Sequence, residues 1–537
     1  MNPLLEKLLN LWPEMTLLIA AVLCLGLGLA RTQATRQLTA PIAAIACLIA
    51  TLLALTVGEP LNSGVGLGAA GGYFRVLFPL LAFILILVCA AVPNRLPQTI
   101  QAESGPEFQP GRSNRGEFFA FALLSTVGAM LTAGADDLVW LFLALELTSL
   151  PTYVMVATSR NNPRAQEAAV KYFFLGAFSA AIFLYGFALI YGATGATDFT
   201  DIRNAIAAET ASTGTLTPLL TTGVLLAVLG IAFKLAAFPM HFYAADVYQG
   251  AATPVTAFLA VIPKTAGFSA LILIMAMIGW PLDKNPTATD AGEIIAFAIA
   301  AIAVLTMTAG NLLALVQTNV KRMLAYSSVA HSGYLLIPVI VGPALTGGAS
   351  GLAALLFYLP AYAAGTIACF AALAALPKEP EDGHTYDDLN GLRATNPLLA
   401  ICLAVGALSL LGLPPLIGFV GKLHIMTAGL ADGHVALITI LIINSAISAG
   451  YYLRLAAGPM ILTRPTTPAE EKTPSHATSK LAIASACIAA TLALALGLFG
   501  GPVLNASTQA ARLSLEKQTP AIESRLTLET QRATETK

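Results

Sequence analysis

The chain has 537 residues, of which 57% are hydrophobic and only 11% are charged, and its formal net charge is −1. Soluble domains carry about 25% charged residues. A mean hydropathy of +0.76 therefore excludes an ordinary soluble enzyme, a disordered chain and a small disulfide-rich protein. The balanced charge gives no indication of nucleic-acid binding. We expect a membrane protein that is folded in the lipid bilayer.

Long apolar runs follow one another along the whole chain. A spanning helix needs about 20 apolar residues, and continuous runs exclude a transmembrane barrel, whose strands alternate in polarity. The pattern predicts an all-α, polytopic membrane protein with about 14 transmembrane helices. The predicted spans are 11–30, 38–58, 73–93, 116–133, 137–157, 168–191, 219–239, 253–280, 292–316, 322–342, 350–376, 395–430, 433–459 and 479–501.

Basic residues indicate the orientation, because lysine and arginine concentrate on the loops that follow odd-numbered spans. The loops after even-numbered spans and their edges carry only Arg75, Arg203 and Lys284. The positive-inside rule places the odd loops in the cytoplasm and both termini on the opposite side. The polar segments 94–116 and 461–478 then form cytoplasmic loops. The charged tail 505–537 fits either a surface helix or a disordered segment.

A few ionisable residues lie inside the predicted spans. They are Glu146, Lys234, Lys264, His331 and Lys422. A lysine at the centre of a spanning helix costs about 2.5–3.5 kcal/mol on insertion scales, so such residues usually face a bundle interior or a hydrated path. Three alternatives stay open at this point: lysines that reach the interface from a helix end, a glutamate in a structural ion pair, and a histidine that is satisfied in the core.

Two spans contain helix-breaking residues beside a lysine. Pro239 follows Lys234 in the seventh span, and the run Gly412–Pro415 precedes Lys422 in the twelfth. Proline removes a backbone hydrogen bond, and unwound backbone in a membrane needs cover from protein or water. The lysine precedes the break in the seventh span and follows it in the twelfth, and the two spans cross the membrane in opposite directions. This arrangement predicts two inverted five-helix repeats made of spans 4–8 and 9–13.

Taken together, the buried charges predict proton transport. A carboxylate near a buried lysine favours the charged amine, so a movable Glu146–Lys234 pair acts as a proton switch that delivers towards Lys264. The sequence contains no P-loop, and its cysteines and histidines are too scattered for a metal or haem site. The energy source is therefore expected in another protein.

The motifs around these residues resemble a known family. The stretch FKLAAFPMHFYAADVYQGAATPVTAFLAVIPKTAGF (233–268) is similar to the antiporter-like membrane subunits of respiratory complex I, the proton-translocating NADH:quinone oxidoreductase. ELTSLPTYV (146–154), QTNVKRMLAYSSVAHSGY (317–334) and LSLLGLPPLIGFVGK (408–422) agree. The segment 317–334 and the position of Lys264 directly after Pro263 favour the subunit N branch of the family.

The resemblance implies specific roles for the residues in the spans. Glu146 would be the glutamate paired with Lys234, Lys264 the central relay, and Lys422 the terminal lysine, with His331 as a further candidate site residue. It implies no cofactor in this chain: NADH, FMN, iron–sulfur clusters and quinone would belong to partner subunits. The implied partners are the adjacent antiporter-like subunit M, the small subunit K and the lateral helix of subunit L, in a bacterial inner membrane with both termini periplasmic.

Four domains are expected on this basis. Residues 1–115 would hold three N-terminal spans and a loop, 116–280 the first repeat, 292–460 the second, and 461–537 a loop, the last span and a polar tail. Three alternative functions stay open. They are a cation/proton antiporter without a redox partner, the membrane arm of an ion-pumping hydrogenase, and a structural subunit whose charges only hold helices together.

Overall fold

The computed structural model describes residues 10–57, 67–90, 115–159, 163–213, 215–280, 290–343, 349–376, 384–462 and 480–516. Secondary structure in these ranges is helical, apart from two isolated bridges that join Asp137 to Asp198 and Asn319 to Thr385. The prediction of an all-α protein is confirmed. Most of the two predicted polar loops, and the tail from residue 517 onward, lie outside the described residues.

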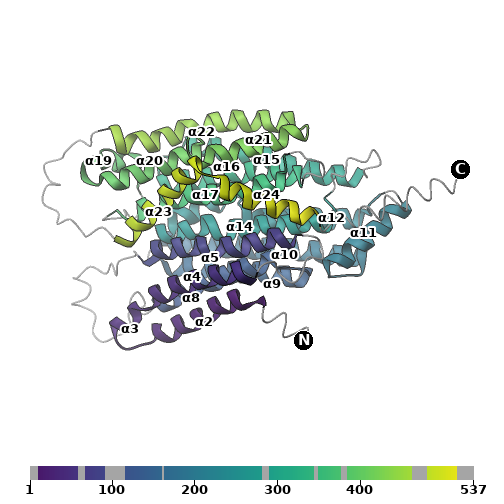
Figure 1. The fold of residues 1–537 in the computed structure, drawn as a ribbon, viewed down its shortest axis with the longest axis horizontal. Helices are drawn as coiled ribbons and strands as arrows, with labels where there is room; N and C mark the ends of the chain where they lie inside the picture. Colours follow the sequence, from purple (N-terminus) through teal and green to yellow (C-terminus); the bar gives the residue numbers. More distant parts are fainter. Residues whose placement is uncertain are drawn as a thin grey trace.

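The helices of the first half lie side by side, with their axes along the long direction of the molecule (Figure 1). The chain begins at one edge of the bundle with α2 and reaches the middle with α14. These helices are α2 (Trp12–Gly28), α3 (Gln33–Gln37), α4 (Thr39–Val57), α5 (Gly68–Ala90), α8 (Arg115–Ala133), α9 (Leu138–Ser159), α10 (Pro163–Thr194), α11 (Phe199–Thr213), α12 (Pro218–Leu235), α13 (Ala244–Gly250) and α14 (Thr253–Met277).

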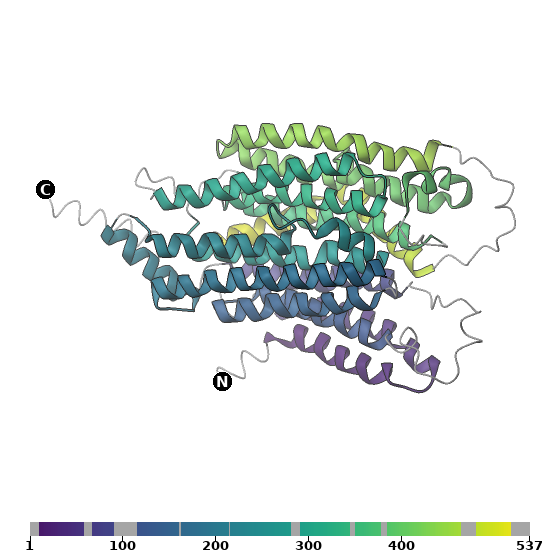
Figure 2. The same cartoon turned by 180° about the vertical axis from the view of Figure 1, so that it is seen from behind.

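The second half continues across the bundle to α22 at the opposite edge, as the view from behind also shows (Figure 2). Its helices are α15 (Asp290–Leu315), α16 (Val320–Val341), α17 (Gly351–Ala374), α18 (Tyr386–Leu389), α19 (Leu392–Thr395), α20 (Pro397–Leu411), α21 (Ile417–Ala431), α22 (Val435–Ile461), α23 (Lys480–Leu498) and α24 (Gly501–Glu516).

Most of the predicted spans appear as single long helices. Twelve described helices are long and apolar enough to cross a membrane, and three shorter apolar helices, α2, α20 and α21, accompany them. The chain is therefore a multi-pass membrane protein. The total of fourteen crossings, the inverted repeats and the four domain boundaries stay predictions.

The seventh and twelfth spans are broken where the sequence predicts. α12 ends at Leu235, after which Ala236 takes the left-handed conformation with φ 53°, and eight residues separate α12 from α13, which begins at Ala244. α20 ends at Leu411 before Gly412, whose φ is 88°, and α21 begins at Ile417. Both breaks leave helix-terminal carbonyl groups free to accept hydrogen bonds inside the bundle.

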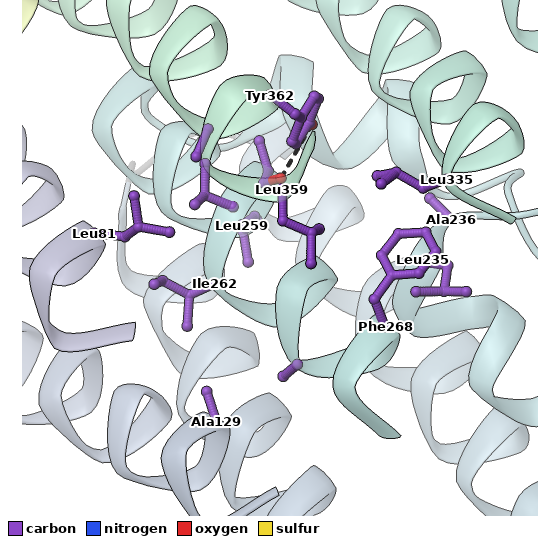
Figure 3. Packing of buried hydrophobic residues seen from close by; sticks show 14 of the residues in the cluster. Leu81, Ala129, Leu235, Ala236, Leu259, Ile262, Phe268, Leu335, Leu359 and Tyr362 are labelled. Atoms are coloured by element: carbon purple, nitrogen blue, oxygen red, sulfur yellow. Dashed lines mark hydrogen bonds between the residues drawn. The ribbon is translucent and has the colours of Figure 1, made fainter. Parts of the chain in front are cut away.

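The core surrounds α14, in which every residue is buried. α16 and α17 are nearly as enclosed, whereas α10, α15 and α22 are buried along only one side. Leu259, Ile262 and Phe268 of α14 lie among side chains of neighbouring helices (Figure 3). The outer helices expose large apolar side chains such as Phe174 and Phe297, which is the surface expected for contact with lipid.

A glycine sets the distance between α10 and α12. A Cβ atom added at Gly186 would lie 2.6 Å from the backbone nitrogen of Ala227 and 2.6 Å from the carbonyl oxygen of Gly223. Real Cβ atoms do not approach so closely, so only glycine permits this packing. The contact fixes α12, and with it Lys234, against α10.

The structure corrects the predicted position of Arg75 and shows how the first part of the charged tail folds. Arg75 does not lie at a loop edge: it is 2% exposed inside α5, and Glu14 of α2 accepts two hydrogen bonds from it at 2.7 Å, so the buried charge is compensated. The part of the tail up to residue 516 forms the helix α24. Its small residues Ala510, Ala511 and Ser514 are buried, and the Ser514 hydroxyl accepts a hydrogen bond from the amide of Ala70 at 3.3 Å.

Candidate functional site

Glu146 of α9 and Lys234 of α12 lie together inside the bundle. Lys234 Nζ is 3.1 Å from Glu146 Oε1. The lysine side chain is 3% exposed and the glutamate side chain is 17% exposed. Lys234 Nζ also donates a short hydrogen bond to the Ser149 hydroxyl, one helical turn beyond Glu146. The amine thus has one charged and one neutral oxygen partner, which satisfies the requirement that a buried charge be paired and hydrogen-bonded.

The break in the seventh span places Lys234 at the end of α12. Its position in the last helical turn is favourable for a cation, because the helix dipole is negative there. The Tyr243 hydroxyl donates to the carbonyl oxygen of Phe233 at 2.9 Å, and the amides of Ala236 and Ala237 bond to the carbonyls of Phe233 and Ala232. The helix end is therefore closed by backbone and by a tyrosine, and the lysine is left to interact with Glu146.

Lys264 lies at the centre of α14 and is 2% exposed. Its Nζ donates to the backbone oxygen and to the hydroxyl of Ser328 on α16, and it lies 5.5 Å from the ring centroid of Tyr362. The ion pairs of the described residues do not include this lysine. Its partners are neutral oxygen atoms and an aromatic face.

Lys422 lies beside the second helix break. Its Nζ donates to the carbonyl oxygen of Leu411, the last residue of α20, at 2.7 Å and to the Ser445 hydroxyl of α22 at 3.0 Å. It also lies 5.2 Å from the ring centroid of Tyr334. The carbonyl that the break frees is therefore the direct partner of this buried amine.

His331 of α16 is held between two tyrosines. Its Nδ1 shares a hydrogen bond of 2.7 Å with the Tyr358 hydroxyl, and its Nε2 one of 2.8 Å with the Tyr452 hydroxyl. The Tyr452 hydroxyl continues to the Ser327 hydroxyl. Because a hydroxyl both donates and accepts, this arrangement accommodates either tautomer of the imidazole and permits proton exchange at both ring nitrogens.

The structure brings some of the predicted residues together and leaves others apart. Lys264 and His331 both contact Tyr362, whose hydroxyl is 2.8 Å from that of Ser328 and whose ring centroid lies 5.2 Å from the imidazole. His331 and Lys422 both contact the ring of Tyr334. Hydrogen bonds through the Ser328 hydroxyl link Lys264 to Tyr362, but the contacts of Tyr362 and Tyr334 with His331 are ring contacts. No hydrogen-bonded chain of described side chains joins Lys234 to Lys264.

Several members of the site are not predicted from the sequence. Ser149, Ser328, Tyr358, Tyr362 and Tyr452 have the direct contacts given above. One signal was available, since Ser327, Ser328, His331 and Ser332 form a polar cluster on one helix, and Tyr358 and Tyr362 are four residues apart, a spacing that places both on one helical face.

A second charged cluster lies where α10, α13 and α16 meet. Lys171 Nζ and Arg322 Nη1 each contact a different oxygen of Asp246 at 2.7 Å. Partial burial opposes ionisation of Asp246, but its hydrogen bonds with Lys171 and Arg322 outweigh burial and hold the pKa of the carboxyl below its ordinary value. This end of the bundle, which also carries Arg164, is called the basic end below.

The comparisons with known proteins identify a family. The family model described as NADH:quinone oxidoreductase/Mrp antiporter, TM, matches residues 135–448. The chain is 35% identical to NADH-quinone oxidoreductase subunit N of Myxococcus xanthus, over 95% of this chain and 99% of that one. It is 40% identical to NADH-quinone oxidoreductase subunit N 1 of Sorangium cellulosum, over 75% and 78%.

Solved structures share the fold. A chain of respiratory complex I from Thermus thermophilus with bound aureothin is 31% identical, with a TM-score of 0.70 over 92% of this chain and 98% of that one. A chain of an archaeal membrane-bound sulfane sulfur reductase is 23% identical, with a TM-score of 0.75 over 95% and 98%. At that identity the second match concerns the fold alone.

Proposed function

The chain belongs to the NADH:quinone oxidoreductase/Mrp antiporter family of membrane subunits, among relatives that are subunits N, and from this premise we propose that it translocates protons in the membrane arm of an NADH:quinone oxidoreductase. One observation carries the proposal. Lys234, Lys264 and Lys422 are buried within the predicted spans, and of these three only Lys234 contacts a carboxylate among the residues that the structure describes. A buried amine with an adjustable counter-charge is a proton carrier whose hold on its proton depends on geometry.

The Glu146–Lys234 pair supplies the switch. At 3.1 Å the carboxylate stabilises the ammonium form of Lys234. If Glu146 moves away, the buried ammonium loses its counter-charge and releases its proton. Moving one charge against 100 mV requires about 2.3 kcal/mol, and breaking a buried ion pair costs about 3–5 kcal/mol. The two energies are of similar size, so electron transfer in a partner subunit would drive transport by separating this pair.

The other candidates form the onward route. Lys264, with its Ser328 and Tyr362 contacts, would accept the proton, and His331 would exchange it through the Tyr358 and Tyr452 hydroxyls. Lys422 would be the terminal carrier. Since ring contacts and gaps separate these groups, we propose that water molecules complete the path between them.

The setting of the subunit follows from the same family. We propose a bacterial inner membrane, with the basic end facing the cytoplasm and both termini in the periplasm, in accordance with the positive-inside rule. The adjacent antiporter-like subunit M, the small subunit K and the lateral helix of subunit L would be its neighbours. NADH, FMN, the iron–sulfur clusters and quinone would be bound by partner subunits.

Proton translocation per NADH oxidised, measured with the purified complex in liposomes, tests this proposal. Glu146→Ala and Lys234→Ala should each reduce the ratio severely in complexes that still contain this chain. Lys480→Ala is the matched control, because Lys480 is exposed at the start of α23 and should leave the ratio unchanged. A normal ratio in an assembled Lys234→Ala complex would refute the relay. Loss of assembly in that variant, with a normal ratio in the assembled remainder, would indicate a structural role instead.

An antiporter or hydrogenase-type membrane arm is the alternative. A chain of the Mrp complex from Dietzia sp. DQ12-45-1b has the same fold at 22% identity, with a TM-score of 0.73 over 95% of this chain and 97% of that one. The fold alone therefore does not select NADH as the electron donor. Affinity purification through this chain discriminates: co-purification with flavin and iron–sulfur subunits that oxidise NADH supports the proposal, and their absence supports the antiporter.

A further inference from the structure

The short helix α13 is held by polar contacts from both halves of the chain. Asp246 bridges Lys171 of α10 and Arg322 of α16, and the Arg322 guanidinium also donates to the Gln249 side chain at 3.1 Å. Lys321, which is fully buried, donates to the carbonyl oxygen of Ala251 at the end of α13. We call Lys171, Asp246, Gln249 and Arg322 the latch.

α13 is preceded by a tyrosine that belongs to a buried aromatic cluster. The ring centroid of Tyr243 lies 4.3 Å from that of Phe233 and 5.3 Å from that of Tyr172, and Tyr172 lies 4.6 Å from Tyr153. All four side chains are buried. These residues, Tyr153, Tyr172, Phe233 and Tyr243, are called the aromatic plug.

The aromatic plug lies between the ion pair and the basic end. Along α9, Glu146, Ser149 and Thr152 follow one another at roughly one turn each towards Ser159. The Thr152 hydroxyl shares a hydrogen bond of 3.2 Å with that of Tyr172, while the Ser159 hydroxyl accepts from the amide of Ala252, just after α13. The route along α9 from the basic end to Lys234 therefore passes the plug.

We propose that α13 closes the basic-end approach to the Glu146–Lys234 pair by holding Tyr243 in the aromatic plug, and that Asp246 is the positioning residue that keeps α13 in place. The purpose of this closure rests on the proposed function, whereas the position of α13 rests on the contacts given above. Lys171, Asp246 and Arg322 are 40%, 35% and 27% exposed, and ion pairs that water reaches are weak. The latch is therefore weak enough to open.

A cysteine behind the plug reports on this closure. Thr152 is fully buried, so in the complete complex a Thr152→Cys thiol should react slowly with a small water-soluble thiol reagent added at the basic end. Asp246→Asn removes both ion pairs and should raise the labelling rate about tenfold, as expected when two weak ion pairs stop opposing an opening. Asp246→Glu should restore slow labelling. Labelling of the complex without the new cysteine is subtracted.

The chain offers a matched control for the latch. Glu167 also contacts Lys171, at 2.7 Å, but it lies on α10 itself and is 63% exposed. Glu167→Gln in the Thr152→Cys background should therefore leave the labelling rate unchanged. Equal acceleration by Glu167→Gln and Asp246→Asn, or no acceleration by Asp246→Asn in assembled complexes, overturns the proposal.

Two further arms keep the test decisive. If Asp246→Asn does not assemble, Arg322→Gln opens the same ion pair from its other side, and Tyr243→Leu removes the plug contact while the latch stays intact; both should accelerate labelling. The assay needs no turnover. Fast labelling of the Asp246→Asn complex together with normal pumping by the Lys234→Ala complex would support the plug and refute the relay. Slow labelling of the Asp246→Asn complex together with lost pumping by the Lys234→Ala complex would refute the plug and support the relay.

Discussion

The two broken helices each place a lysine beside a helix end but give it different partners. Lys234, at the end of α12, contacts the Glu146 carboxylate at 3.1 Å. Lys422, beside the end of α20, contacts the Leu411 carbonyl and the Ser445 hydroxyl at 2.7 and 3.0 Å. A carboxylate that moves changes the charge around an amine by one full unit, whereas neutral dipoles cannot. The first break is therefore suited to switching and the second to passing a proton on.

Replacement of Lys234 or Lys422 should give the largest difference in stability between the two helix breaks. Lys234→Gln leaves the partly buried Glu146 carboxylate without its cationic partner, which destabilises by up to about 3–5 kcal/mol. Lys422→Gln leaves only a carbonyl and a hydroxyl without their donor, at a cost of about 1–3 kcal/mol. The temperature at which this chain dissociates from the purified complex should therefore fall further for Lys234→Gln.

The double variant Glu146→Gln/Lys234→Gln is the control for that comparison. It removes both charges, so it should regain most of the thermal stability that Lys234→Gln loses, while pumping stays lost. Equal destabilisation by Lys234→Gln and Lys422→Gln, without recovery in the double variant, would show that the Glu146–Lys234 contact is not the source of the difference.

The sequence predicted the helices and the buried ionisable residues, because both depend on composition over short windows. Apolar runs define helices, Pro239 and Gly412 mark the breaks, and a lysine within an apolar run is conspicuous. The partners Ser149 and Tyr452 were not predictable in this way, since serine and tyrosine are common in helices and acquire a role only when tertiary packing brings another helix close.

The same reasoning explains the remaining differences. Glu14 and Arg75, which form a buried pair between α2 and α5, are 61 residues apart in sequence, so hydropathy alone predicts Arg75 near a loop. α13 has seven residues, which is too short for a periodic signal, and its position depends on Asp246 meeting two helices from different halves of the chain.

Close backbone packing should give the next largest effect and should act on both regions. A Cβ at Gly186 meets α12 at 2.6 Å, and one at Gly418 would lie 1.8 Å from the carbonyl oxygen of Ser409, across the second break. Gly186→Ala and Gly418→Ala should each destabilise by about 1–3 kcal/mol, the usual cost of overpacking. Gly186→Ala should lower pumping by displacing Lys234, and Gly418→Ala by displacing Lys422.

A glycine in open space serves as the control. A Cβ added at Gly26 in α2 would have no atom within 4 Å other than those of its own stretch of helix, so Gly26→Ala should leave pumping unchanged and raise helix stability by up to about 1 kcal/mol. Thermal dissociation of the complex and protons translocated per NADH are the measurements. Normal behaviour of Gly186→Ala would show that α10 and α12 separate without affecting the ion pair.

The smallest effect concerns pH at the basic end. The pKa of Asp246 lies below its ordinary value of 3.8, because the hydrogen bonds from Lys171 and Arg322 outweigh its partial burial. A lowered carboxyl pKa stabilises the folded state at every pH above 3.8 and loses that contribution as the pH falls through the lowered value. The difference in thermal stability between the parent and Asp246→Asn should thus be constant from about pH 8 to pH 5, at no more than about 1 kcal/mol per ion pair.

A difference that already vanishes between those pH values would mean that Asp246 is protonated there, which the two cationic contacts at 2.7 Å argue against. The latch would then have to act through the hydrogen bond between Arg322 and Gln249 rather than through the ion pairs of Asp246.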